Sequence, residues 1–411
     1  MTDVVSNSLL DEKSAEMADF LVVLGTALHA YGTPTHRIEE AVTEVARKHG
    51  LRAQFLVTPT SIQASFGQGS RRVHYLERVD AGEVDLQKLT RLHRLLQAAY
   101  QGEIDPASAA AEVEEVRDAE PGYPRPVLAL GFSLASAAAA RVFAGGPAEI
   151  GVSAIAGLIL GTLMVYGVSI ARLQRLIVPL GALVTAVTVG ILSNFIEVVR
   201  PICIIASLIV MIPGMRLTSA MQELALGHLV SGTARMTGAI LILMQLGLGV
   251  ALGSNLIDAL TSPMLADTPT SLPGWSTAVA IVFVAFSCTV LYLGRMRDFL
   301  TVLPMSFVAY FASRYGQMWL GPEVGAAIGA LLLGIGANAI SRWLDQPTAI
   351  AIIPALLLLV PGSLGFRSLQ SLMAEDVTTG IAAGFSTFMI AIAIVSGLLV
   401  ANLLVVSRRL L

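Results

Sequence analysis

Two Pro-Gly pairs, Pro213–Gly214 and Pro361–Gly362, interrupt apolar segments at positions 148 residues apart. Proline disfavours helix at the residue before it and glycine permits a sharp turn, so each pair predicts a broken helix. Broken helix ends leave N–H groups that can bind a carboxylate and C=O groups that can bind an ammonium group. An amino-acid zwitterion needs both. The alternative is that each pair merely ends a helix at the membrane surface.

The two pairs belong to a longer internal repeat. Residues Ile209–Gly232 and Leu357–Gly380 align without a gap. The alignment pairs Gln222 with Gln370, Leu224 with Leu372, Gly232 with Gly380, and His228 with Asp376. Matched apolar segments broken by Pro or Gly in two halves of a chain are typical of the binding site of a secondary transporter.

Polar side chains near the breaks complete the predicted site. Ionisable groups near apolar segments are costly and are usually functional, although reaching to the membrane surface is an alternative role. Glu223 and Asp376 are therefore predicted to carry a proton. For Asn194 and Asn338, hydrogen bonding between helices is an alternative to lining a cavity. The residues predicted to bind substrate are Pro213, Gly214, Ser231, Arg235, Pro361, Gly362, Thr379, Asn194 and Asn338.

The composition predicts a polar domain followed by a membrane domain. The mean hydropathy is +0.73 and 55% of the residues are hydrophobic. Residues 1–126 hold all the lysines and carry a net charge of −6, whereas residues 127–411 carry +3. The predicted domains are a cytoplasmic α+β domain over residues 1–120 and two membrane halves over residues 121–256 and 257–411.

Ten membrane-spanning helices are predicted, five in each half. Because five is an odd number, the halves must cross the membrane in opposite senses, as two inverted repeats. Pro213–Gly214 would then lie near the inner side and Pro361–Gly362 near the outer side. The predicted spans are roughly residues 127–144, 148–170, 176–197, 199–213, 232–254, 275–294, 299–315, 322–341, 347–361 and 379–406.

The distribution of arginines predicts the orientation. Predicted inner loops contain Arg172 and Arg175, and Arg295 and Arg297, whereas the loop from Asn255 to Gly274 has acids and no base. This bias places both termini in the cytoplasm of a multi-pass plasma-membrane protein. The acidic N-terminal residues contain no apolar segment typical of a secretory signal.

The N-terminal domain has alternating helix and strand signals. Strands are predicted around Phe55/Val57 and Val73/Tyr75. His36, Glu39 and Glu40 share one helical face and could form a metal or acid–base site, but a solvated charged face is the simpler interpretation. His29 and His49 are predicted on helix surfaces. The predicted helices are Ala15–Tyr31, Pro34–His49, Leu86–Tyr100 and Ala107–Asp118.

Several classes of function are disfavoured by missing motifs. No GxxxxGK[ST] sequence is present, which argues against ATP-driven transport, and no hydrolase motif such as GxSxG or HExxH occurs. Cys203 and Cys288 lie in apolar segments and are predicted to be core residues. We expect no cofactor, no metal and no nucleic-acid partner. The expected partners are a small-molecule substrate, protons and the lipid bilayer, and a homo-oligomer is compatible with the sequence.

The chain resembles the threonine/serine exporter (ThrE-type) family over nearly its whole length. The N-terminal resemblance lies in GTALHAYGTPTHRIEEAVTEVARKHGL, especially Gly32, Thr35, Arg37 and Glu39. The membrane resemblance lies in IPG…AMQELALGHLVSGTARM and VPG…SLQSLMAEDVTTGIAAGF. Glu223 departs from the family pattern, in which aspartate is expected.

The resemblance implies export of L-threonine and L-serine, driven by the proton-motive force through alternating access. It also implies a cytoplasmic N-terminal domain and ten spans in two halves, and it implies a transporter rather than an enzyme. Some relatives act on a dicarboxylate, so an exporter of a small dicarboxylate such as succinate is an alternative. A membrane-embedded hydrolase is a third, less favoured interpretation.

Overall fold

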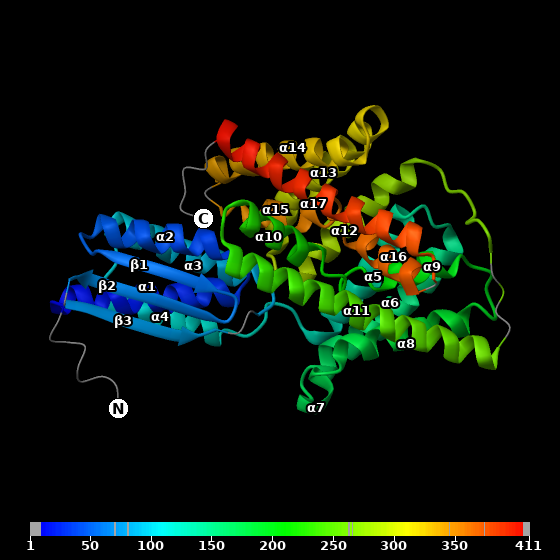
Figure 1. The fold of residues 1–411 in the computed structure, drawn as a ribbon, viewed down its shortest axis with the longest axis horizontal. Coiled ribbons are helices and arrows are strands. Elements are labelled where there is room, and N and C mark those ends of the chain that lie inside the picture. The colour runs from blue at the N-terminus through cyan, green and yellow to red at the C-terminus, as the bar shows by residue number, and fades with distance from the viewer. Residues whose placement is uncertain are drawn as a thin grey trace.

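The chain folds into two parts that lie end to end (Figure 1). The computed structural model describes residues 10–405 apart from residues 70, 80, 81, 262, 263, 265, 345 and 374. The N-terminal part combines helices with a small sheet, and the described elements of the larger part that follows are all helices.

The N-terminal part is built on a three-stranded antiparallel sheet with the order β1-β2-β3. Alternation along β2 buries Ile62, Ala64 and Phe66 against the helices, as the pleat of a half-buried sheet requires. The elements are α1 (Glu12–Ala30), α2 (Thr35–Lys48), β1 (Ala53–Thr58), β2 (Ser61–Gln68), β3 (Arg71–Arg78), α3 (Leu86–Gln101) and α4 (Pro106–Asp118).

The four predicted helices of this part are confirmed within a few residues. The predicted surface position of His29 is wrong, because its side chain is buried and its Nε2 lies 2.8 Å from the carbonyl oxygen of Thr58. A hydrogen bond to a strand end allows this polar ring to occupy the core. His49 is exposed, as predicted.

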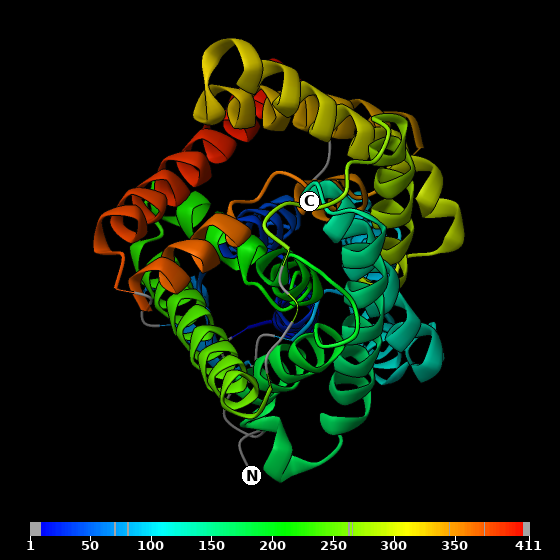
Figure 2. The same cartoon turned by 90° about the vertical axis from the view of Figure 1, so that its right-hand side faces the viewer.

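The helical part consists of long helices and several short ones. Seen along the long axis of the molecule, the long helices form a ring with shorter helices inside it (Figure 2). Its elements are α5 (Arg125–Val142), α6 (Pro147–Gly167), α7 (Ala171–Gln174), α8 (Ile177–Leu192), α9 (Arg200–Ser207), α10 (Gly214–Ala225), α11 (Leu229–Leu260), α12 (Trp275–Leu291), η2 (Met296–Asp298), α13 (Phe299–Leu320), α14 (Pro322–Leu344), α15 (Ala349–Leu356), α16 (Gly362–Met373) and α17 (Val377–Leu404).

Four of the described helices, α6, α11, α14 and α17, are long and apolar enough to cross a membrane by length and composition. This pattern makes the larger part a helical membrane domain. The ten-span prediction is not confirmed. The segments predicted as the fourth and ninth spans contain α9 and α15, which have eight residues each and are therefore only about 12 Å long.

The internal repeat has a structural counterpart. Helices α10 and α16 begin and end at positions that differ by 148 residues. In the first half, a Cβ added to Gly232 would lie 2.6 Å from Leu224, and in the second half one added to Gly380 would lie 2.5 Å from Leu372. Each turn between the short and the long helix is therefore packed in the same way, and only glycine allows this approach.

The two Pro-Gly breaks lie against each other. A Cβ added to Gly214 would meet Val360 at 2.6 Å, and one added to Gly362 would meet Ile212 at 2.7 Å and the Cα of Gly214 at 3.0 Å. The contacts are reciprocal, because Ile212 and Val360 occupy equivalent positions in the repeat. The expectation that the breaks lie near opposite sides of the membrane is therefore wrong: they meet at one level.

Equivalent helices of the two halves approach the N-terminal part with opposite ends. Helix α11 begins there, where Ser231 donates a hydrogen bond to the carbonyl oxygen of Val57. Helix α17 ends there, where Asn402 shares a cavity wall with Arg37. Helix α15, which precedes the second break, lines that same cavity along its length from Thr348 to Leu356, whereas no described residue of the cavity wall belongs to α9.

Candidate functional site

A fully buried carboxylate, Glu223, joins the N-terminal part to the first half of the helical part. Its Oε1 accepts hydrogen bonds from the N–H of Thr35 at 3.2 Å and from the hydroxyl of Thr35 at 2.9 Å. The Nε of Arg235 lies 3.0 Å from both carboxylate oxygens. Because Thr35 is the first residue of α2, the carboxylate also lies at the positive end of that helix.

A second layer of contacts surrounds this ion pair. The Nδ1 of His228 lies 3.7 Å from Glu39, and the Oε1 of Glu39 accepts a hydrogen bond from the N–H of Val57 at 2.7 Å. The rings of His36 and His228 have centroids 5.8 Å apart. The segment around Thr35, which carries the N-terminal family resemblance, therefore packs directly on the end of α10 and the turn between α10 and α11.

A cavity of about 350 Å³ lies beside this junction. Its wall includes the loop before α2 and Arg37, residues of α1 and α3, the first turns of α10, Arg235 and Gly238 of α11, the whole length of α15 and the end of α17. Both parts of the molecule and both halves of the repeat thus contribute to one cavity. Its size is within the range of small-molecule sites.

The cavity wall is cationic. Arg37, Arg216 and Arg235 line it, and among the described lining residues there is no aspartate or glutamate. Hydroxyl and amide groups of Thr218, Gln222 and other residues add hydrogen-bonding capacity. Guanidinium groups bind carboxylates with two parallel hydrogen bonds, so the wall is suited to a small solute that carries a carboxylate.

Two predicted site residues, Arg235 and Glu223, meet at the cavity, although Glu223 lies behind its wall. The Pro-Gly residues Pro213, Gly214, Pro361 and Gly362 are not part of the wall, because their backbones pack on each other. Ser231 is turned toward the N-terminal part rather than the cavity.

The remaining predicted residues lie elsewhere. Asn338 donates to the Oδ1 of Asn402 at 2.9 Å, which is the helix-to-helix hydrogen bond that was the alternative interpretation. Asn194 donates to carbonyl oxygens at the end of its own helix. Asp376 caps α17, and its carboxylate accepts from the N–H of Thr379 at 3.2 Å.

The sequence predictions missed Arg37 and Arg216 as cavity residues. Arg216 directly follows the first break, and Arg37 belongs to the segment that carries the family resemblance. Its place in that segment is the one feature of the sequence that could have indicated Arg37, because nothing local in the sequence shows that α2 contacts the helical part.

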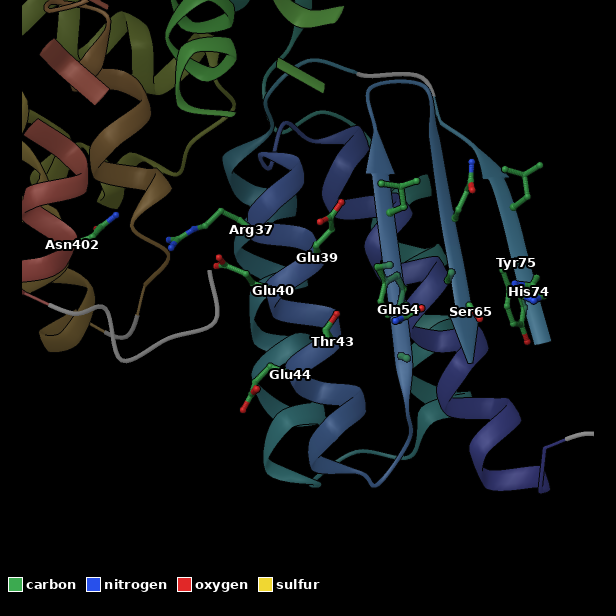
Figure 3. Close-up of a pocket in the computed structure, with 16 residues that line it drawn as sticks. Arg37, Glu39, Glu40, Thr43, Glu44, Gln54, Ser65, His74, Tyr75 and Asn402 are labelled. Carbon is green, nitrogen blue, oxygen red and sulfur yellow. The ribbon is translucent and has the colours of Figure 1, made fainter. Parts of the chain in front are cut away.

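A larger hollow of about 1210 Å³ lies on the N-terminal part, over α2 and the outer face of the sheet (Figure 3). It is lined by Glu39, Glu40 and Glu44 on α2, and by polar residues of the strands such as His74. In the described part of the chain no group of three or more His, Cys, Asp or Glu residues could hold a metal ion. The predicted solvated face of α2 is wrong for two of its three residues, because His36 is buried and Glu39 is half-buried with contacts to Val57 and His228, and only Glu40 is exposed.

Acid should weaken the packing of α2. Burial, with Arg37, His228 and Arg235 nearby, lowers the pKa of His36 to about 3 from 6.5. Between these values only the unfolded chain binds the proton, so the free energy of unfolding should rise with pH up to about 6.5 and then level off. Burial also raises the pKa of Glu39, and the contribution of Glu39 to the pH dependence of stability has the opposite sign to that of His36. The contribution of His36 is therefore measured as the difference between wild type and a variant of His36.

We expect wild-type protein to lose more thermal stability between pH 7.5 and pH 5 than His36→Gln does. His74→Gln, which changes an exposed histidine of β3, is the matched control and should behave as wild type. Equal acid sensitivity of wild type and His36→Gln would contradict the assignment.

The fold defines a multi-pass helical membrane protein, and its cavity has the size of a small-molecule site. Residues 19–257 match the ThrE family model of threonine/serine exporters, and residues 276–404 match a second model described as "Threonine/Serine exporter, ThrE". The chain therefore belongs to the threonine/serine exporter family, and this membership points to a membrane transporter.

The chain is also similar to fungal membrane proteins. It is 26% identical over 374 residues to pheromone-regulated membrane protein 10 of Pichia sorbitophila, covering 88% of this chain and 38% of that protein. Against the protein of that name in Saccharomyces cerevisiae, identity is 24% over 370 residues, covering 86% of this chain and 47% of the other. The chain thus spans less than half the length of these curated relatives. No solved structure matches it.

Proposed function

We propose that the protein is a secondary exporter of small hydrophilic amino acids, with L-threonine and L-serine as substrates. The observation that carries the proposal is the cavity between the N-terminal part and the broken helices, with a cationic and hydroxyl-rich wall. Family membership supports the export of these solutes.

In this proposal the two halves form an inverted repeat that exposes the cavity alternately to the two sides of the plasma membrane. The reciprocal contact of the breaks and the opposite directions of α11 and α17 support it. Residues 1–120 form a cytoplasmic domain, the halves comprise residues 121–256 and 257–411, and both termini are cytoplasmic.

We assign proton coupling to Glu223 in preference to Asp376. Glu223 is buried and paired with a cavity arginine, whereas Asp376 is exposed. A proton on Glu223 would remove the charge that holds Arg235 and would weaken the contact with Thr35. Loading and release of a carboxylate at Arg235 would thereby be linked to the proton.

The test is counterflow of labelled threonine in proteoliposomes with an imposed pH gradient. Export predicts accumulation that depends on the protein and increases with the gradient. Equal movement in protein-free vesicles would refute the proposal, and movement indifferent to the gradient would refute the coupling.

Export of a small dicarboxylate such as succinate is the second candidate. The observation in its favour is that the described cavity wall has three arginines and no carboxylate to pair with an ammonium group. Competition of unlabelled threonine, serine and succinate against each labelled solute would separate the two candidates.

A further inference from the structure

Helix α2 brings a cation from the N-terminal part to the cavity. The hydrogen bonds from Thr35 to Glu223 fix the first turn of α2 against α10. Arg37 follows two residues later, and its side chain extends away from α2 toward Asn402 of α17 (Figure 3). The position of Arg37 is therefore set by a buried contact between the two parts and not by a loose surface.

Among the described residues the guanidinium of Arg37 makes no hydrogen bond or close ion pair, although the residue is half-buried; the carboxylate of Glu40, on the same helix, attracts it electrostatically from beyond ion-pair distance. Two other half-buried arginines are paired, Arg235 with Glu223 and Arg200 with Asp258 at 2.7 Å. A partly desolvated guanidinium without an acceptor leaves up to five donors available to a ligand.

Arg37 also lies between two hollows of the molecule. Arg37 and Asn402 line both the cavity of about 350 Å³ and the larger hollow over α2. These two residues therefore stand where the outer hollow and the inner cavity adjoin. Within the cavity, Arg37 shares the wall with Arg216 and Arg235.

We propose that Arg37 is a substrate-binding residue that holds the carboxylate of the transported solute, so that the N-terminal part completes the transport site. The inference rests on the proposed function and names one chemical group of the solute, the carboxylate that amino acids and dicarboxylates share. The proposal gives the N-terminal part a direct role in binding, because a movement of α2 away from the helical part would remove Arg37 from the solute.

The experiment measures concentration dependence of threonine and succinate transport by the full chain in proteoliposomes. Loss of a charge-assisted hydrogen-bonded contact should raise KM about 10- to 100-fold in Arg37→Gln, with a much smaller change in maximal rate. Arg37→Lys keeps the charge but not the planar fork and should give an intermediate KM. The matched control is Arg47→Gln, on the same helix, whose arginine is exposed and pairs with Glu44.

The results distinguish failure of the proposed transport function from failure of the proposed role of Arg37. If wild type moves neither solute, the proposed function fails. If wild type transports but Arg37→Gln keeps the wild-type KM, or loses only maximal rate, Arg37 is not a ligand and the inference fails. Should Arg37→Gln be unstable by thermal unfolding, Arg37→Lys decides: a wild-type KM overturns the proposal and a raised KM supports it.

Discussion

Replacing Glu223 with glutamine should lower the free energy of unfolding by about 3 kcal/mol, because it leaves Arg235 without its counter-ion in a largely buried position. The estimate is at the lower end of the usual range, since Arg235 also lines the cavity and keeps some access to water. Thermal unfolding of the purified protein in detergent measures the effect as a fall in Tm.

The control for this variant is Glu44→Gln, which removes a carboxylate from a surface pair with Arg47. Exposed pairs contribute at most about 1 kcal/mol, so its Tm should stay near that of wild type. In Glu223→Gln/Arg235→Gln the loss should be smaller than the sum of the two single losses, because neither charge is then left alone. Additive losses, or a Tm of Glu223→Gln that matches the control, would disprove the buried ion pair.

The same variant tests the role of Glu223 in coupling. If its protonation links transport to the pH gradient, Glu223→Gln should abolish the stimulation of threonine counterflow by the gradient while retaining exchange at zero gradient. If transport by this variant still depends on the pH gradient, Glu223 does not couple protons to transport and its ion pair with Arg235 has only a structural role.

Local features of the fold were predictable because they depend on periodicity and turn chemistry. The apolar face of residues 15–31 predicted α1, and the Pro-Gly pairs predicted helix breaks, which the structure has between α9 and α10 and between α15 and α16. The lengths of the helices were less predictable. The apolar segment before Pro213 continues to Ile212, but α9 ends at Ser207. Proline disfavours helix only at the residue before it, and the hydropathy of residues 208–211 gives no sign of the turns that the structure has there.

The site was predictable only where its residues are close in sequence. Glu223 and Arg235 are 12 residues apart and flank one turn, so their proximity could be expected. The contact between Thr35 and Glu223 joins residues 188 apart. No periodic pattern specifies which distant elements meet, so Arg37 entered the candidate site only through the structure.

Adding a methyl group at the contact of the two breaks should impair transport strongly. In Gly362→Ala the new Cβ would lie 2.7 Å from Ile212 and 3.0 Å from the Cα of Gly214, so backbone must move. Overpacking of this kind costs about 1–3 kcal/mol. The larger effect is expected on rate, because a shift of either break displaces α10 or α15, which form the cavity wall. Threonine counterflow in proteoliposomes would measure that rate.

The equivalent glycines Gly214 and Gly362 allow crowding by a side chain to be distinguished from crowding by the backbone. In Gly214→Ala the nearest atom is the Cγ2 of Val360 at 2.6 Å, whereas the Cα of Gly362 is 3.5 Å away. Trimming the neighbour should therefore restore part of the transport rate in Gly214→Ala/Val360→Ala, but little in Gly362→Ala/Ile212→Ala, where backbone atoms remain in the way. Gly151→Ala, on a helix where an added Cβ meets nothing within 4 Å, should transport as wild type. Full activity of Gly362→Ala would mean that the breaks are not packed against each other during transport, and the reciprocal contact would then have no part in the mechanism.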